Sequence, residues 1–249
     1  MKLLRLAVSL VICVVTFNCS SPESKLIIAT SANMQYAMKA LAESFEQETG
    51  VKADLIISSS GKLTSQILVG APYDIFFSAD LKYPEYLADE NITLNEPEIY
   101  AYGQLVLWTT IVGKSINPHD LLLEDRIAIA NPKIAPYGKA AWEVLEKLEI
   151  QEIVRDRLVF GESIAQVNQF ITIQSADVGF TSKSSVIANP DFGGKWVQLT
   201  DSLYTPITQA MVILKDSKRQ ESAFQLAEFV KSAKGQEILN RFGYSTSTY

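Results

Sequence analysis

Apolar residues form two patterns along this chain: short continuous runs, and repeats spaced by three or four residues. The run at 25–30 (KLIIAT) predicts a buried strand, and the spacing of Met34, Leu41 and Phe45 behind it predicts an amphipathic helix that ends at Gly50. The alternation continues with strands at 51–57 and 74–77 and helices at 63–69 and 81–88. Strands that alternate with helices indicate parallel pairing in a doubly wound sheet.

A second series with the same rhythm begins at the strand-like run 104–110. It continues through strands at 127–130, 158–160 and 178–181 and helices at 139–148 and 164–173. A strand-like run at 207–214 and two amphipathic helices, at 217–232 and 235–241, follow it. The 249 residues are enough for two lobes of ordinary size. We therefore predict an α/β protein with two doubly wound lobes joined by hinge strands and a ligand cleft between them.

Four short turns rich in serine, threonine or glycine each follow a predicted strand and precede a predicted helix. They lie at 29–32, 58–61, 135–138 and 162–164, two in each series. Ligands of open α/β sheets bind beyond the carboxyl ends of the strands, where these turns fall. A helix N-terminus carries unpaired N–H groups and partial positive charge. Converging turns would bind a small, multiply charged anion, although each turn taken singly is better explained as an ordinary helix cap.

The N-terminus has the features of an export signal. Lys2 and Arg5 precede an apolar run at 6–17 that is too short for a stable membrane span. We predict a signal peptide at 1–18 and an exported protein of the periplasm or cell envelope. Cys19 follows at once and resembles a bacterial lipoprotein attachment site, which would anchor the protein to a membrane. The alternative is ordinary cleavage that leaves a soluble form.

Composition and charge exclude several function classes. Hydrophobic residues make up 47% and charged residues 20% of the chain, which indicates a globular protein. The formal net charge is −6 and falls to −8 without Lys2 and Arg5, and no basic cluster offers a nucleic-acid site. His119 is the only histidine, and Cys19 is the only cysteine outside the signal peptide. These counts exclude the usual zinc sets, and a Ser-His-Asp triad would have to use His119. We expect neither an enzyme nor a cofactor.

Several segments together resemble the molybdate-binding proteins of bacterial ABC uptake systems over essentially the whole mature chain. They are ATSA at 29–32, SSSGKLTSQI at 58–67, GAPYDIFFSAD at 70–80, YGQLVLW at 102–108, NPKIAPYGKAA at 131–141, ESIAQ at 162–166, ADVGFTS at 176–182 and RFGY at 241–244. The segments at 70–80 and 131–141, in this order and at this separation, are the most specific to the family.

The resemblance implies the class II periplasmic binding protein fold. Its first lobe would comprise 25–101 plus 210–249 and its second 102–209, with hinges near 102–103 and 206–208. The implied ligand is molybdate or tungstate, so that molybdenum enters only as the oxyanion. The implied partner is a membrane permease driven by an ATPase, and we expect the binding protein to be a monomer.

The family's ligand residues fall on five positions of this sequence. The resemblance implies that Thr30, Ser31 and the Ser60 hydroxyl bind the anion together with the backbone N–H groups of Tyr137 and Ile164. Some relatives add a tyrosine hydroxyl where this chain has Ser182, whose side chain is too short to reach the same oxygen.

Two alternatives stay open at this stage. The same fold could bind another oxyanion such as sulfate or phosphate, because a fold does not determine a ligand. Molybdate carries no proton at neutral pH and needs donors only, whereas monoprotonated phosphate would profit from a carboxylate, and Glu162 is the nearest one in the four turns. Ser59 and Lys62 match the Ser-x-x-Lys motif of penicillin-recognising acyl enzymes, but the companion Ser-Asp-Asn and Lys-Thr-Gly elements are absent from the sequence.

Overall fold

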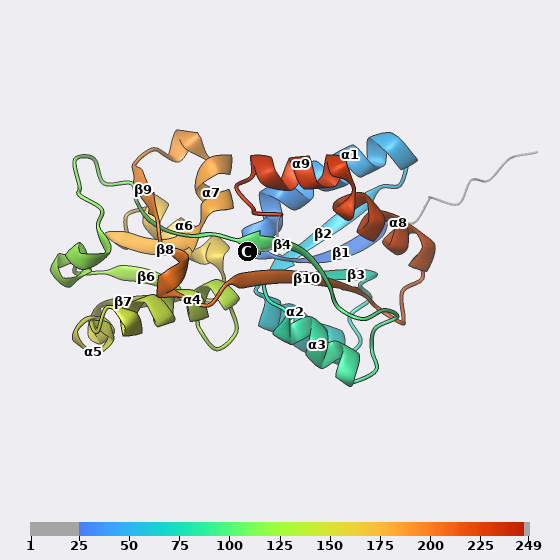
Figure 1. The fold of residues 1–249 in the computed structure, drawn as a ribbon, viewed down its shortest axis with the longest axis horizontal. Coiled ribbons are helices and arrows are strands. Elements are labelled where there is room, and N and C mark those ends of the chain that lie inside the picture. The colour runs from blue at the N-terminus through green and yellow to red at the C-terminus, as the bar shows by residue number, and fades with distance from the viewer. Residues whose placement is uncertain (1–24, 247–249) are drawn as a thin grey trace, which may run out of the picture.

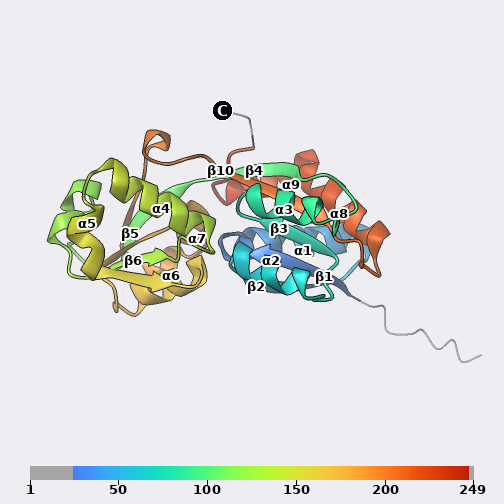
Figure 2. The same ribbon diagram turned by 90° about the horizontal axis from the view of Figure 1, so that it is seen from below.

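The computed structural model describes residues 25–246, so the predicted signal peptide and Cys19 lie outside the described part. Two α/β lobes lie side by side, each built on a five-stranded sheet with helices on both faces (Figures 1 and 2). This arrangement confirms the predicted fold class. Within residues 25–246, no helix combines the length and the apolar character that crossing a bilayer requires.

The first lobe contains the sheet with strand order β2-β1-β3-β10-β4. Its strands are β1 (Leu26–Ser31), β2 (Ala53–Ser58), β3 (Ile75–Ser78), β4 (Glu98–Gly103) and β10 (Ile207–Ile213). Its helices are α1 (Gln35–Thr49), α2 (Ser60–Leu68), α3 (Lys82–Asp89), α8 (Gln220–Lys231), α9 (Ala233–Arg241) and a short 3-10 turn, η1 (Ala32–Met34). Apolar residues of α1, α8 and α9 pack on one face of the sheet, and those of α2 and α3 pack on the other. Both faces are therefore buried, as the continuous apolar strand runs require.

The second lobe contains the sheet with strand order β7-β6-β8-β5-β9. Its strands are β5 (Leu105–Thr109), β6 (Ile127–Ala130), β7 (Leu158–Gly161), β8 (Val178–Ser182) and β9 (Lys195–Gln198). Its helices are α4 (Pro136–Lys147), α5 (Gln151–Val154), α6 (Ile164–Thr172) and α7 (Lys183–Ala188), with 3-10 turns η2 (Pro118–Leu123), η3 (Arg155–Arg157), η4 (Pro190–Phe192) and η5 (Asp201–Leu203).

The sheets are mixed, whereas the sequence pattern indicated parallel pairing. β1 runs parallel to β2 and β3, but β10 is antiparallel to β3 and β4. In the second lobe β6 is parallel to β7 and β8, but β5 is antiparallel to β8 and β9. The antiparallel strands β5 and β10 are those that enter a lobe from the other one, without the crossover helix that parallel neighbours need.

The chain crosses between the lobes on paired strands. β4 ends at Gly103 and β5 begins at Leu105, while β10 brings the chain back beside β4 (Figure 2). Gly103 pairs with Ile207 and Tyr102 with Thr208, which are the segments expected to act as hinges. The expected lobe boundaries near residues 101 and 210 fall within these paired strands, and the hinge motion itself remains a prediction.

Candidate functional site

The four turns that the sequence singled out meet around one small cavity between the lobes. Ser31, Ser59 and Ser60 line it from the first lobe. Ala135, Tyr137 and Ile164 line it from the second lobe. The cavity encloses about 10 Å³, roughly the space that one group of the size of water needs. Any ligand held there is small, compact and in contact with both lobes.

The first-lobe hydroxyls are buried and mostly unused. Among the described residues, Thr30 Oγ1 and Ser31 Oγ have no hydrogen-bond partner, although both residues are almost completely buried. A buried hydroxyl without a partner costs about 1–3 kcal/mol, so each such group in a native protein asks for an explanation. Ser31 lies on the cavity wall, whereas Thr30 precedes it in β1 and is not one of the lining residues.

Ser60 is bonded on one side only. Its Oγ accepts a hydrogen bond of 3.0 Å from the backbone N–H of Ala79, at the end of β3. A hydroxyl that accepts from an amide still has its own proton to donate. Ser60 is fully buried and lines the cavity, so this proton is available to an acceptor bound there.

The second lobe offers backbone donors. Tyr137 is the second residue of α4, after Pro136, and Ile164 is the first residue of α6. An N–H in the first turn of a helix has no intrahelical acceptor. The Tyr137 hydroxyl lies beside Gly103, where an added Cβ would be 2.2 Å away from it. Burial raises the pKa of this hydroxyl well above its ordinary value.

Two lining residues were missed by the sequence argument. Ser59 is buried and its Oγ has no partner within residues 25–246. Asn33 also lines the cavity, but its amide donates to Gln209 Oε1 at 2.9 Å and to the Tyr244 hydroxyl at 3.1 Å. The serine cluster of the second turn pointed to the position of Ser59, whereas no local signal distinguishes Asn33 from a helix-start residue.

Ser182 does not line the cavity. Its Oγ accepts from the backbone N–H of Ser185 and so caps α7. The same Oγ lies 3.2 Å from Ser184 Oγ and 2.8 Å from Ser185 Oγ. This hydroxyl is used within its own lobe.

The lobes contact each other directly around the cavity. The Gly61 N–H donates to the carbonyl of Ile134 at 3.0 Å, and Ser184 Oγ donates to the carbonyl of Asn33 at 2.5 Å. At the rim, Lys62 of α2 forms an ion pair with Glu162 of the second lobe. The structure is therefore a closed form in which the two lobes are in direct contact beside the cavity.

The cavity wall is neutral and carries no carboxylate. None of its lining residues is Asp, Glu, Lys or Arg. Glu162, the one carboxylate of the four turns, is committed to the ion pair with Lys62 outside the cavity. The wall thus presents hydroxyl and amide donors, which suits an anion whose oxygens only accept hydrogen bonds.

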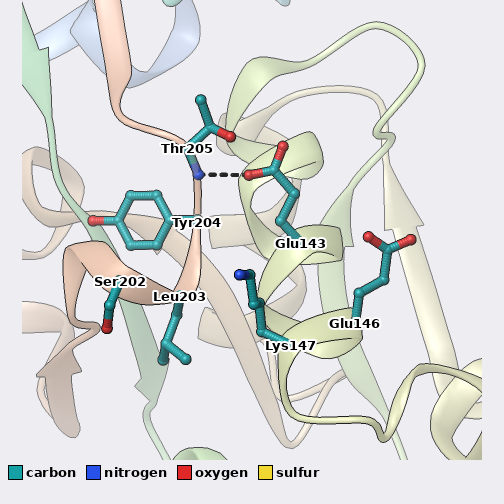
Figure 3. Close-up of a pocket in the computed structure, with 7 residues that line it drawn as sticks. All are labelled: Glu143, Glu146, Lys147, Ser202, Leu203, Tyr204 and Thr205. Carbon is teal, nitrogen blue, oxygen red and sulfur yellow. Dashed lines mark hydrogen bonds between the residues drawn. The ribbon is translucent and has the colours of Figure 1, made fainter.

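A larger hollow of about 470 Å³ lies elsewhere, between α4 and the segment after η5 (Figure 3). Glu143, Glu146 and Lys147 line one side of it. Glu143 accepts from the backbone N–H of Thr205 at 2.6 Å, and Glu146 accepts from Trp142 Nε1 at 2.9 Å. Two carboxylates repel an anion, so this hollow is not the oxyanion site.

Two specific kinds of site, a metal centre and an acyl-enzyme site, can be checked in the described residues. Within residues 25–246, no group of three or more His, Cys, Asp or Glu residues is placed to hold a metal. Lys62, the would-be base of the Ser-x-x-Lys motif, is paired with Glu162, and the Ser59 hydroxyl has no partner in the described chain that could activate it. An acyl enzyme would need such a base next to its serine.

Comparisons with known proteins show the family of this chain. A family model described as a bacterial extracellular solute-binding protein matches residues 26–245. A molybdate-binding protein from Azotobacter vinelandii is 36% identical over 231 residues, covering 91% of this chain and 92% of the relative. One from Rhodobacter capsulatus is 35% identical over 225 residues, covering 89% and 88%.

A solved structure gives the same result in three dimensions. The periplasmic molybdate-binding protein of Azotobacter vinelandii superposes with a TM-score of 0.86 at 33% identity, covering 90% of this chain and all of that one. These relatives are solute-binding proteins and not enzymes, in agreement with the absence of a catalytic set from the sequence. The chain belongs to the bacterial extracellular solute-binding proteins, in the family of the molybdate-binding proteins.

Proposed function

We propose that this protein captures molybdate, and tungstate with it, outside the cytoplasm and delivers it to an ABC importer. The observation that carries the proposal is a small, neutral, donor-only cavity built from four helix starts, with buried hydroxyls left unpartnered. Two relatives that cover most of the chain are named molybdate-binding proteins, which supports the choice of anion. Molybdate and tungstate are close in size and equal in charge, so we assign both to the site.

We assign the anion's oxygens to Thr30, Ser31, the Ser60 hydroxyl, and the backbone N–H groups of Tyr137 and Ile164. A hydrogen bond to a charged group contributes about 1.5–3 kcal/mol, and a tetrahedral anion held by about seven such bonds in all would gain a gross ~10–20 kcal/mol. Lost motion and lobe closure offset several kcal/mol of this. The remainder, about −8 to −12 kcal/mol, corresponds to micromolar to nanomolar affinity.

Size, rather than charge, must separate molybdate from sulfate. Both ions are tetrahedral dianions, and donors spaced for the oxygens of the larger ion leave those of the smaller one too far from some of them. Phosphate differs in another way, because its monoprotonated form needs an acceptor, and no carboxylate lines the cavity. The proposed order of affinity is therefore molybdate and tungstate above sulfate and phosphate.

Isothermal titration of the purified protein with the four anions tests the proposed function. We expect micromolar or tighter binding of molybdate and tungstate and much weaker binding of sulfate and phosphate. Equal affinity for sulfate and molybdate would refute the assignment and favour a general oxyanion carrier.

The proposal also covers export and membrane anchoring through the N-terminus. We propose that cleavage after residue 18 leaves Cys19 as an acylated N-terminus, which holds a monomeric binding protein near its permease. Each buried methylene of an acyl chain contributes about 0.8 kcal/mol to membrane binding. Mass spectrometry of the mature N-terminus tests this point, since an unmodified start would exclude the anchor without affecting the anion site.

A further inference from the structure

Serines stand at the N-caps of several helices in this protein, and their hydroxyls are used in two different ways. Ser163 Oγ accepts from the backbone N–H of Gln166, and Ser232 Oγ accepts from that of Gly235 at 3.2 Å. These serines do what N-cap residues normally do. Ser31 and Ser59 occupy the same position at η1 and α2, but neither makes a side-chain capping bond.

Whether a serine at an N-cap makes its capping bond depends on whether it lines the cavity. Ser31 and Ser59 both line the cavity, whereas Ser163 and Ser232 do not. Ser59 has an extended backbone, with φ of −73° and ψ of 151°, which is the ordinary conformation of an N-cap. Its hydroxyl is thus placed where a capping bond is normally made, yet the bond is missing.

The Ser59 hydroxyl is also cut off from water. The residue is 3% exposed, and its Oγ finds no hydrogen-bond partner anywhere in the part of the chain that the structure describes. Burying an unpartnered hydroxyl is unfavourable, so such a group is retained where something outside the chain satisfies it.

The neighbouring donors explain why an additional hydroxyl is useful at this place. The N–H of Gly61, in the first turn of α2, points to the carbonyl of Ile134 and is used in closing the lobes. This N–H group in the first turn of α2 is therefore not available to bind an anion. A hydroxyl from Ser59, beside that of Ser60, supplies a donor from the same turn.

We propose that Ser59 is a further ligand of the oxyanion, donating from Oγ to one of its oxygens together with Ser31 and Ser60. The inference rests on the proposed function in that the ligand is a small oxyanion held in this cavity. The site then has a wall of three adjacent serine hydroxyls in the first lobe, which matches a fully deprotonated tetrahedral dianion.

The test compares Ser59→Ala with a matched serine that caps a helix. Ser232→Ala removes a hydroxyl that does cap, at the start of α9 and away from the cavity. Each variant and the wild-type protein are titrated with sodium molybdate by calorimetry, and each ligand-free protein is unfolded in urea.

The two variants should respond in opposite ways. We expect Ser59→Ala to weaken molybdate binding about tenfold to a hundredfold, the range for one hydrogen bond to a charged group, while the ligand-free protein keeps or raises its urea midpoint. Ser232→Ala should keep wild-type affinity and lower the urea midpoint. Wild-type affinity in Ser59→Ala would overturn the proposal, and so would a fall in affinity accompanied by an equal fall in the stability of the ligand-free protein.

The wild-type titrations separate this inference from the proposed function. If wild-type protein binds sulfate or phosphate in preference to molybdate, the choice of ligand is wrong, and the same variants titrated with the preferred anion still decide the role of Ser59. If wild-type protein binds none of the four anions, both proposals are overturned.

Discussion

At Gly61, adding a single methyl group should weaken ligand binding without destabilising the ligand-free protein. A Cβ on this residue would lie 2.6 Å from the Tyr83 hydroxyl, 2.9 Å from the carbonyl oxygen of Ile134 and 3.0 Å from its Cα. The Tyr83 hydroxyl ends a side chain that can move. Ile134 contributes backbone from the opposite lobe, so that relief requires the lobes to separate.

The two effects of Gly61→Ala have opposite signs. In the closed form, the clash with Ile134 resembles overpacking, which costs about 1–3 kcal/mol, and it lengthens the hydrogen bond from the Gly61 N–H to the Ile134 carbonyl. In an open form the clash is absent, and alanine within a helix is favoured over glycine by about 0.5–1 kcal/mol. We therefore expect the Kd for molybdate to rise about 5- to 150-fold while the ligand-free protein becomes slightly more stable.

Calorimetric titration measures the first effect and urea unfolding of ligand-free protein the second. Small-angle X-ray scattering adds a direct reading, because the decrease in radius of gyration on adding molybdate should be smaller in Gly61→Ala than in wild type. A double variant with Tyr83→Phe serves as the control: it removes one of the three close contacts and leaves both contacts with Ile134. Affinity should therefore not recover in the double variant.

Two results would refute this reasoning. Unchanged affinity in Gly61→Ala would mean that Ile134 does not approach Gly61 in the bound state. A loss of stability in the ligand-free protein as large as the loss of affinity would place the clash within one lobe rather than between the two.

The remaining predictions concern single side chains at or near the cavity. Ser60→Ala should weaken molybdate binding about 10- to 150-fold by calorimetry, because it removes a donor to the anion, and it should also destabilise the ligand-free protein by leaving the Ala79 N–H without its acceptor. Lys62→Ala should change the Kd less than about fivefold, because its ion pair with Glu162 joins side chains that are 40% and 67% exposed, but stopped-flow measurements should show slower association at low salt. Equal losses of molybdate affinity in Ser60→Ala and Lys62→Ala would instead indicate that Lys62 is a ligand. Asp80→Asn tests a pH effect, because burial raises the pKa of the Asp80 carboxyl above its ordinary 3.8. The contribution of this carboxyl to the stability of the wild-type protein is fully present below pH 3.8, and it is lost as pH rises through the higher pKa of the folded state. The variant should gain stability over wild type as pH rises from about 4 to 7 in urea titrations, and parallel pH profiles would contradict this prediction.

The sequence by itself determined the fold class and indicated where the candidate site lies. The repeats that form α1 and the apolar runs that form β1 are local signals, because burial on one face imposes a period that can be read without knowing the partner. The four turns were visible for the same reason, since a strand end followed by a helix start is also local. Of the five residues that the family resemblance implies, Ser31, Ser60, Tyr137 and Ile164 line one cavity, whereas Thr30 does not.

The sequence pattern misses a short, exposed strand and does not give the direction of the strands that enter each lobe. β9 comprises four residues and is mostly exposed, so it carries no apolar period. β5 and β10 read as strands, but their antiparallel direction depends on where the chain crosses between lobes, which no local window contains.

Only the tertiary structure decided what each hydroxyl does. Ser59 and Ser163 look alike in sequence, each a serine before a helix, yet Ser163 caps its helix and Ser59 lies unpartnered on the cavity wall. Likewise, the sequence could not reveal that Gly61 contacts Ile134 or that Lys62 meets Glu162, since these pairs join segments far apart in the chain. Caps and strands follow from nearest neighbours, whereas the ligand cavity exists only because two separately folded lobes bring their helix starts together.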